Sequence, residues 1–342
     1  MLYVFTCAYN SEGTLHRCVN SILQQTYSDF LYYILDNGST DNTKEILEEY
    51  ARYDKRIKPI FNKSNQCCMT IHILKNIFQL KCEESYFCTL DADDEYSPDF
   101  LKKMMTFISE YSLDVATCGT SWMEQKTGKI IKQKVLERNI ILEDKEFATQ
   151  FPEYRNFMVT SWCGIYSINV LKRCNFNWYY NAMNFADTAF AMEAFRKAKH
   201  AGVFAESLHK YYISSKTDSY KYNPKWFYAC KNLIEISREY LLDYGEISKK
   251  NEDYLYVLLL ILIKYILPRI QNAEVDLAEK LKCLNEIFSD KMTQYILKYW
   301  HEVGIYSDKG EFLRDINDWI KSQDGWEKER SIVKKIISLM NI

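Results

Sequence analysis

The feature that most constrains the fold of this chain is an alternation of strands and helices in its first hundred residues. Apolar runs of strand length at 2–9, 30–35 and 86–90 each end in a polar turn, and a segment with helical apolar spacing follows each of them. This β-α-β-α-β-α order predicts an α/β fold in which helices flank a mostly parallel sheet. In such sheets ligands bind beyond the carboxyl ends of the strands. The polar turns at 36–41 and 91–94 fall at those ends.

The chain is long enough for two domains. Its 342 residues exceed what one hydrophobic core usually serves. We expect a main domain at 1–220 and an all-helical C-terminal region at 221–342, because the Leu-, Tyr- and Lys-rich segments beyond Pro224 lack strand alternation. The apolar run at 254–267 is too short to span a membrane and carries Lys264, so we expect a buried helix there.

The composition excludes several classes of protein. A formal net charge of -2 disfavours nucleic-acid binding. The 11 cysteines are scattered and nowhere spaced as CxxC, and the 5 histidines form no HxxxH pair, so zinc lacks an expected ligand set and free thiols in a reducing cytoplasm are indicated. The first residues carry no secretory signal pattern, and we therefore expect a cytoplasmic protein.

Three acidic residues in a row of four follow the third strand. Asp91 and Asp93 are expected to converge at the strand end, and converging carboxylates repel each other unless a cation joins them. Hard oxygen ligands of this kind suit Mg²⁺ or Mn²⁺. The alternative is an acidic turn that only caps the next helix. Because Ser97 is the expected N-cap of that helix, we favour a metal site with Asp93 and Asp91 as ligands.

Three motifs in order point to a family. The first strand ends in CAYN (7–10), the second is followed by DNGSTDNT (36–43), and the third runs into LDADD (90–94) ahead of a helix with proline in its first turn. In this order and spacing they resemble the family 2 glycosyltransferases, which have the Rossmann-like GT-A fold. The resemblance implies a nucleotide-binding half at 1–100, an acceptor half at 101–220 and a nucleoside diphosphate sugar as donor.

The resemblance also implies a donor site. Tyr9 would frame the base, and Asn37, where many members carry Asp, would accept the imide proton of a base that we expect to be uridine. Lys75 would meet the diphosphate, Asp93 would bind the metal directly, and Asp91 would lie near the ribose or the uridine. Strand packing for Tyr9 and a solvated helix position for Lys75 stay open as alternatives. The expected donor-binding residues are Cys7, Ala8, Tyr9, Asp36, Asn37, Lys75, Asp91, Ala92 and Asp93.

An acceptor hydroxyl needs a base, and the resemblance implies Asp187 for that role. Asp187 stands where the family carries the Asp of a Glu-Asp pair at a helix start, although Ala186 replaces the Glu. A helix N-cap is the structural alternative for Asp187, and Glu193 is the alternative base.

The acceptor pocket is expected around Trp162 and Gly164, since a tryptophan face suits the apolar side of a sugar ring; a core position is the alternative for Trp162. Where relatives carry an arginine near a mobile loop, this chain offers His209 or Lys210 as the phosphate contact, and a surface loop is the alternative.

The resemblance, together with these residues, implies a metal-assisted, inverting hexosyltransferase that would use a nucleoside diphosphate sugar and act on a carbohydrate or lipid-linked glycan in surface polysaccharide or glycoconjugate synthesis. A nucleotidyltransferase is disfavoured, because the loop after the first strand lacks a basic residue before His16 and Arg17. A noncatalytic sugar-nucleotide-binding scaffold stays open. The C-terminal helices are expected to dock on the main domain, to form a homodimer or to lie against the inner face of the membrane.

Overall fold

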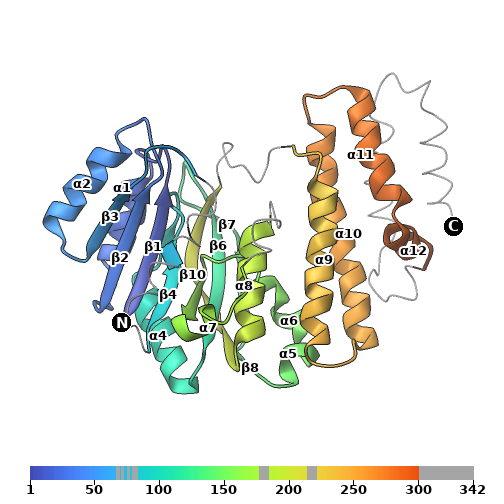
Figure 1. Ribbon diagram of the computed structural model, residues 1–342, viewed down its shortest axis with the longest axis horizontal. Helices are drawn as coiled ribbons and strands as arrows, with labels where there is room; N and C mark the ends of the chain where they lie inside the picture. Colours follow the sequence, from blue (N-terminus) through green and yellow to red (C-terminus); the bar gives the residue numbers. More distant parts are fainter. Residues whose placement is uncertain are drawn as a thin grey trace. The chain divides into compact units, whose positions relative to one another are not determined.

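The computed structural model describes residues 1–66, 70, 73–74, 78, 84–176, 185–213 and 222–299. The chain forms two compact units, residues 1–215 and 216–342 (Figure 1).

The first unit begins with the predicted alternation of strands and helices. The elements are β1 (Leu2–Ala8), α1 (Leu15–Leu23), β2 (Phe30–Asp36), α2 (Thr43–Tyr53), β3 (Ile57–Phe61) and β4 (Tyr86–Thr89). Strands β3, β2, β1 and β4 lie side by side in that order and all their pairings are parallel. Their carboxyl ends therefore share one edge, where Ala8 is the register partner of Asp36 and Asp36 that of Phe61.

The rest of the first unit extends the same sheet. Its elements are β5 (Glu95–Tyr96), α4 (Phe100–Tyr111), β6 (Val115–Glu124), β7 (Ile130–Lys134), β8 (Ile140–Glu143), α5 (Glu146–Thr149), α6 (Phe151–Tyr154), a 3-10 turn (Arg155–Phe157), β9 (Gly164–Ser167), α7 (Ile168–Leu171), α8 (Ala186–Lys197) and β10 (His200–Ile213). Strand β9 lies antiparallel between β4 and β6, and β10 pairs with β6 in parallel. Among the described strands, β3, β2, β1, β4, β6 and β10 thus run in one direction. The predicted α/β fold with a mostly parallel sheet is confirmed.

Helix α1 shows why the sequence pattern was informative. The apolar stripe of α1 (Leu15, Cys18, Val19 and Ile22) is fully buried in the core cluster that covers β1 and β2. Burial of an aliphatic side chain of this size contributes about 1.5–3 kcal/mol, so this face holds the helix against the sheet. The helix in turn carries Arg17, which becomes important at the site.

The N-cap predicted at Ser97 was wrong by two residues, and Asp41 is not the N-cap of α2. Helix α2 begins at Thr43 after Asn42, although Asp41 still accepts a hydrogen bond from the Thr43 backbone N–H at 3.0 Å. Helix α4 begins at Phe100 after the N-cap Asp99; Ser97 lies two residues earlier, and its carbonyl accepts from the Phe100 N–H at 2.9 Å. Ser97 therefore does not cap this helix, and the preference for a metal site over an acidic turn must rest on the geometry of the acids themselves.

The second unit is helical throughout its described part, as predicted. It comprises α9 (Trp226–Leu242), α10 (Lys249–Gln271), α11 (Leu277–Ser289) and α12 (Lys291–Tyr299). Helix α10 begins at a regular N-cap, where the Ser248 hydroxyl accepts from the Asn251 N–H, and Arg238 clamps Glu252 with two hydrogen bonds of 2.8 and 2.9 Å. No helix in the described residues is both long and apolar enough to cross a bilayer.

Candidate active site at the strand ends

The loops after β1 and β2 are fastened to each other. The Asn37 N–H donates to the Ala8 carbonyl at 2.8 Å, and the Asn10 N–H donates to the Ser39 hydroxyl at 2.9 Å. Asn10 also accepts from the Thr40 N–H at 2.8 Å, and its φ of 49° lies in the left-handed region that asparagine adopts more readily than most residues. These bonds make one fixed wall from two loops that the sequence predicted to bind the donor.

The predicted donor residues of this wall are close to the acidic turn. Cys7 is half-buried, and burial, together with the negative charges of Asp91 and Asp36, raises the pKa of its thiol to about 12. Ala8 is buried beside it, whereas Tyr9 is 46% exposed and has its aromatic face available. The structure thus brings the ends of β1, β2 and β4 together. Lys75 lies outside the described residues.

Asp91, Asp93 and Asp94 form a compact cluster, with carboxylate oxygens within 4.8 Å of one another. Burial and the neighbouring charges of Asp187 and Asp94 raise the pKa of Asp91 well above its usual range, although its side chain still reaches solvent. Carboxylates held this close stabilise a shared cation, because it removes their mutual repulsion. The cluster therefore fits a divalent metal ion.

Buried polar groups hold the backbone of the acidic turn in place. The Thr6 hydroxyl donates to the Leu90 carbonyl at 2.8 Å and lies 2.9 Å from the Tyr32 hydroxyl. The Cys18 thiol donates to the Asp91 carbonyl at 3.3 Å. Because Thr6, Cys18 and Tyr32 are fully buried, the position of Asp91 is fixed by the core and not by the loop alone.

The third acid, Asp94, faces the interior. It is fully buried, accepts from the Tyr212 N–H at 2.9 Å and lies 3.3 Å from Nε2 of His209. Burial raises the pKa of Asp94 and lowers the pKa of His209 to about 3, so the imidazole of His209 is neutral at physiological pH. Because His209 is fully buried, the phosphate contact predicted for it was wrong. Lys210, the other predicted contact, lies 3.8 Å from Glu95.

Sequence analysis missed Arg17 as a functional residue. Its guanidinium donates to the Asp93 carbonyl and lies over the Tyr212 ring, 3.7 Å from the ring centroid. Arg17 thereby ties α1 to the acidic turn and to the end of β10, and it is a permanent positive charge beside two carboxylates. The only sequence signal was that Arg17 is the first arginine after β1, which does not reveal its packing on Tyr212.

Asp187 lies in the first turn of α8 and is not its N-cap, which is Phe185. The Ser161 hydroxyl donates to Asp187 at 3.0 Å and accepts from the Thr89 hydroxyl at 3.4 Å, two residues before Asp91. Burial raises the pKa of Asp187, and the bond from Ser161 opposes that shift. The alternative base, Glu193, is buried elsewhere and accepts from the Asn175 N–H at 2.9 Å.

The predicted acceptor residues lie in the core beside this site. Trp162 is only 7% exposed, and its ring stacks on His209 with the ring centroids 4.2 Å apart. Gly164 is buried in β9, where a Cβ would lie 2.5 Å from the Tyr166 hydroxyl. Both residues shape the wall behind Ser161, and their contact with an acceptor stays a prediction.

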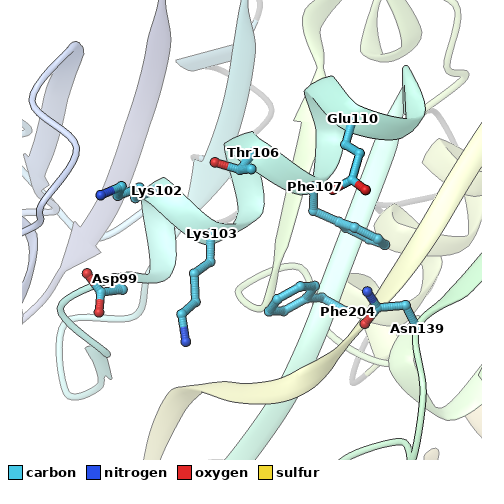
Figure 2. Close-up of a pocket in the computed structure, with 8 residues that line it drawn as sticks. All are labelled: Asp99, Lys102, Lys103, Thr106, Phe107, Glu110, Asn139 and Phe204. Atoms are coloured by element: carbon cyan, nitrogen blue, oxygen red, sulfur yellow. The ribbon is translucent and has the colours of Figure 1, made fainter.

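A surface pocket of about 340 Å³ contains none of these residues (Figure 2). It lies along α4, and its aromatic side comes from Phe107 and Phe204, whose ring centroids are 5.2 Å apart. Lys103, also in its lining, is paired with Glu206 at 2.6 Å. Charge in the pocket is thus largely balanced, and nothing in it resembles the acidic cluster.

Comparison with known proteins gives a consistent family match. The profile described as "Glycosyl transferase family 2" matches residues 3–174, which are 172 of the 342 residues. An uncharacterised glycosyltransferase of Haemophilus influenzae is 33% identical over 152 residues, 41% of this chain and 46% of that protein. The uncharacterised glycosyltransferase YibD of Escherichia coli is 24% identical over 307 residues, 86% of each chain. The chain therefore spans about half the length of the first relative and most of the second.

Solved structures of similar fold are glycosyltransferases as well. TarS of S. aureus, residues 1–349 in complex with UDP-GlcNAc, matches with a TM-score of 0.51 at 18% identity, over 86% of this chain and 75% of that one. The mannosyltransferase PcManGT of Pyrobaculum calidifontis, in complex with GDP-Man and Mn²⁺, matches with a TM-score of 0.50 at 10% identity, over 99% and 86%. At these identities the similarity concerns the fold alone, and it confirms the GT-A architecture.

Proposed function

The chain belongs to glycosyl transferase family 2, and from that premise we propose that it transfers a hexosyl group from a UDP-sugar to an acceptor hydroxyl with inversion at the anomeric carbon. The observation that carries the proposal is the link between Asp187 and the strand that ends in the acidic turn, through hydrogen bonds from Ser161 to Asp187 at 3.0 Å and from Thr89 to Ser161 at 3.4 Å. A metal-binding cluster and a separate carboxylate at one strand edge are what a single displacement requires. The complex of TarS with UDP-GlcNAc supports uracil as the base.

Asp93 and Asp91 would hold a Mn²⁺ or Mg²⁺ ion. The fit rests on the three carboxylates within 4.8 Å, and PcManGT was solved with Mn²⁺. When bound, such an ion offsets the negative charge that develops on the departing diphosphate. Arg17 keeps the backbone of Asp93 in place, and its charge adds to the positive side of the site.

Asp187 is proposed as the base. Its carboxylate accepts the proton of the acceptor hydroxyl while that oxygen bonds to the anomeric carbon and the bond to the diphosphate oxygen breaks on the opposite face. One displacement inverts the anomeric centre. Ser161 orients the carboxylate, and the hydroxyl of Thr89 orients Ser161, so the base is linked to the strand that carries the acidic turn.

The proposal predicts that replacing Ser161 changes the pH dependence of kcat. Replacing Ser161 with alanine removes a hydrogen bond that lowers the pKa of Asp187, so that pKa rises. Since the base acts only when deprotonated, the acidic limb of the kcat profile should move to higher pH, while kcat on the alkaline plateau stays within about threefold of the parent. The matched control is Ser109→Ala on the exposed face of α4. An unshifted acidic limb for Ser161→Ala would contradict the role of Asp187.

The acceptor is proposed to be a carbohydrate or lipid-linked glycan in surface polysaccharide or glycoconjugate synthesis. One relative, 30% identical over 125 residues, is the putative teichuronic acid biosynthesis glycosyltransferase TuaG of Bacillus subtilis. The direct test measures UDP release from a panel of UDP-sugars with simple glycosides as acceptors. Acceptor-dependent release from one donor supports the enzyme, whereas donor binding without any release, including slow hydrolysis, favours the noncatalytic scaffold.

A cytoplasmic location at the inner face of the membrane is proposed on surface chemistry. Strand β7 exposes Ile130 and Ile131 (55% and 58%) between Lys129 and Lys132, a pairing of apolar and basic groups that suits an anionic lipid surface. We expect the protein to co-sediment with vesicles that contain phosphatidylglycerol but not with pure phosphatidylcholine. The double variant I130D/I131D should lose at least about tenfold in vesicle affinity. Equal sedimentation of parent and variant would rule out this surface.

A homodimer through the C-terminal helices stays a prediction.

A further inference from the structure

The side-chain amide of Asn37 is fully used inside the protein. Its Nδ2 donates to the Gln66 carbonyl at 2.8 Å and to Oδ1 of Asn65 at 3.0 Å. Its Oδ1 accepts from Nδ2 of Asn62 at 2.9 Å and from the Gln66 N–H at 3.1 Å. Two donors and two lone pairs are the whole capacity of an amide. In this arrangement Asn37, which the sequence predicted to accept the imide proton of the base, has no lone pair left for it.

The pairing with Gln66 explains why this position carries an amide. Asn37 bonds to both the N–H and the C=O of one residue, as an adjacent strand would do, and these two backbone groups fix which amide atom is oxygen. A carboxylate could accept from the Gln66 N–H, but it would place negative charge against the Gln66 carbonyl and against Oδ1 of Asn65. Aspartate at this position therefore cannot form the same four hydrogen bonds.

The backbone of the segment that bonds to Asn37 also lies very close to the next residue, Gly38. Gly38 has a φ of +81°, and a Cβ built on it would lie 2.6 Å from the Cα and carbonyl carbon of Ser64. The backbone of Ser64 thus occupies the space that any side chain at position 38 would need. The segment 62–66 also begins at the carboxyl end of β3, where the Asn62 N–H donates to the Asp36 carbonyl at 2.9 Å. Asn37 and Gly38 together seat this segment at the edge where the predicted donor residues gather.

We propose that Asn37 is a positioning residue that fastens the segment 62–66 over the Asn37–Gly38 turn, and that this fastened segment, rather than the Asn37 side chain, recognises the nucleotide base. This inference rests on the proposed function, because it concerns the donor site. Discrimination between bases then depends on all four hydrogen bonds of the Asn37 amide. A residue at position 37 that can only accept hydrogen bonds would not hold the segment in place.

The decisive variant is Asn37→Asp, which supplies an acceptor for an imide proton but removes both donors. We expect its Kd for UDP, measured by calorimetry with Mn²⁺, to rise at least about tenfold, and the ratio of its Kd values for GDP and UDP to move toward one. The value of kcat at saturating donor should change by less than about threefold, because the reacting groups are not touched. The matched control Asn139→Asp makes the same change where the side chain only accepts, from the Ala205 N–H, and should bind UDP like the parent.

Other outcomes of these measurements would overturn the inference. If Asn37 reads the base directly, Asn37→Asp keeps or improves UDP affinity and discrimination, and the inference is overturned. Should this variant not fold, Asn62→Ala removes one bond to Oδ1 and should weaken UDP about two- to fivefold with the same loss of discrimination, whereas unchanged binding would overturn the inference. If the parent protein binds no nucleoside diphosphate with any metal, the proposed function itself fails, which is a distinct outcome.

Discussion

Replacing Asp187 with asparagine should lower kcat for sugar transfer by a factor on the order of 10³, because an amide cannot take the proton of the attacking hydroxyl. Asparagine keeps the size of the side chain and can still accept the hydrogen bond from Ser161, so the fold and the donor site should survive. Steady-state kinetics with saturating donor and acceptor measures the loss, and UDP titration should give a Kd within about threefold of the parent.

Glu193→Gln is the matched control for that experiment. Glu193 lies on the same helix but is bonded to the Asn175 N–H, which a glutamine oxygen can also accept. It should retain activity within about threefold. Near-parent turnover by Asp187→Asn, or a collapse of turnover in Glu193→Gln at unchanged folding, would reverse the assignment of the base.

Replacing Asp93 with asparagine should abolish metal-dependent donor binding. Loss of one of two anionic ligands reduces the attraction for a divalent cation, and without the cation the diphosphate faces the remaining carboxylate of Asp91. We expect the apparent affinity for Mn²⁺ in the presence of UDP to fall by a factor on the order of 10², and turnover at ordinary metal concentration to fall at least as far.

Asp99→Asn provides the control for Asp93. This carboxylate is exposed, accepts from the Thr26 hydroxyl at 2.8 Å and stands outside the cluster, so the variant should bind Mn²⁺ and UDP like the parent. If Asp93→Asn also keeps parent affinity for the metal, the cluster is only an acidic turn, which was the alternative open at the level of sequence.

Local patterns allowed the nucleotide-binding half to be predicted. The spacing of Leu15, Cys18 and Ile22 and the strand runs before the polar turns depend on neighbours in sequence, and the structure buries these residues as expected. The antiparallel insertion of β9 between β4 and β6 was not predictable in this way, since its pairing joins segments distant along the chain. The start of α4 was misplaced because the Ser-Pro pair typical of a first helical turn lies just ahead of the actual N-cap, Asp99.

The site was predictable to a smaller extent than the fold. Motifs identified the acids, but burial decides what each acid does, and burial arises from distant packing. Asp94 is turned toward His209, which Trp162 covers, so the histidine offered as a phosphate contact is neutral and internal. Arg17 was missed because its contacts, the Asp93 carbonyl and the Tyr212 ring, come from other elements. Asn37 was assigned to the base because the motif alone does not reveal that its side chain is hydrogen-bonded to Gln66.

Thermal unfolding with and without donor tests most directly whether this protein binds a nucleoside diphosphate sugar through a metal at Asp91 and Asp93. A ligand at 100 times its Kd stabilises by about 2.7 kcal/mol, which corresponds to a rise in Tm of about 5–10 °C for a unit of this size. We expect this rise with one UDP-sugar and Mn²⁺, its loss on chelation and its absence in Asp93→Asn. An unchanged Tm with every nucleoside diphosphate and its sugars, under any divalent metal, would contradict the donor site.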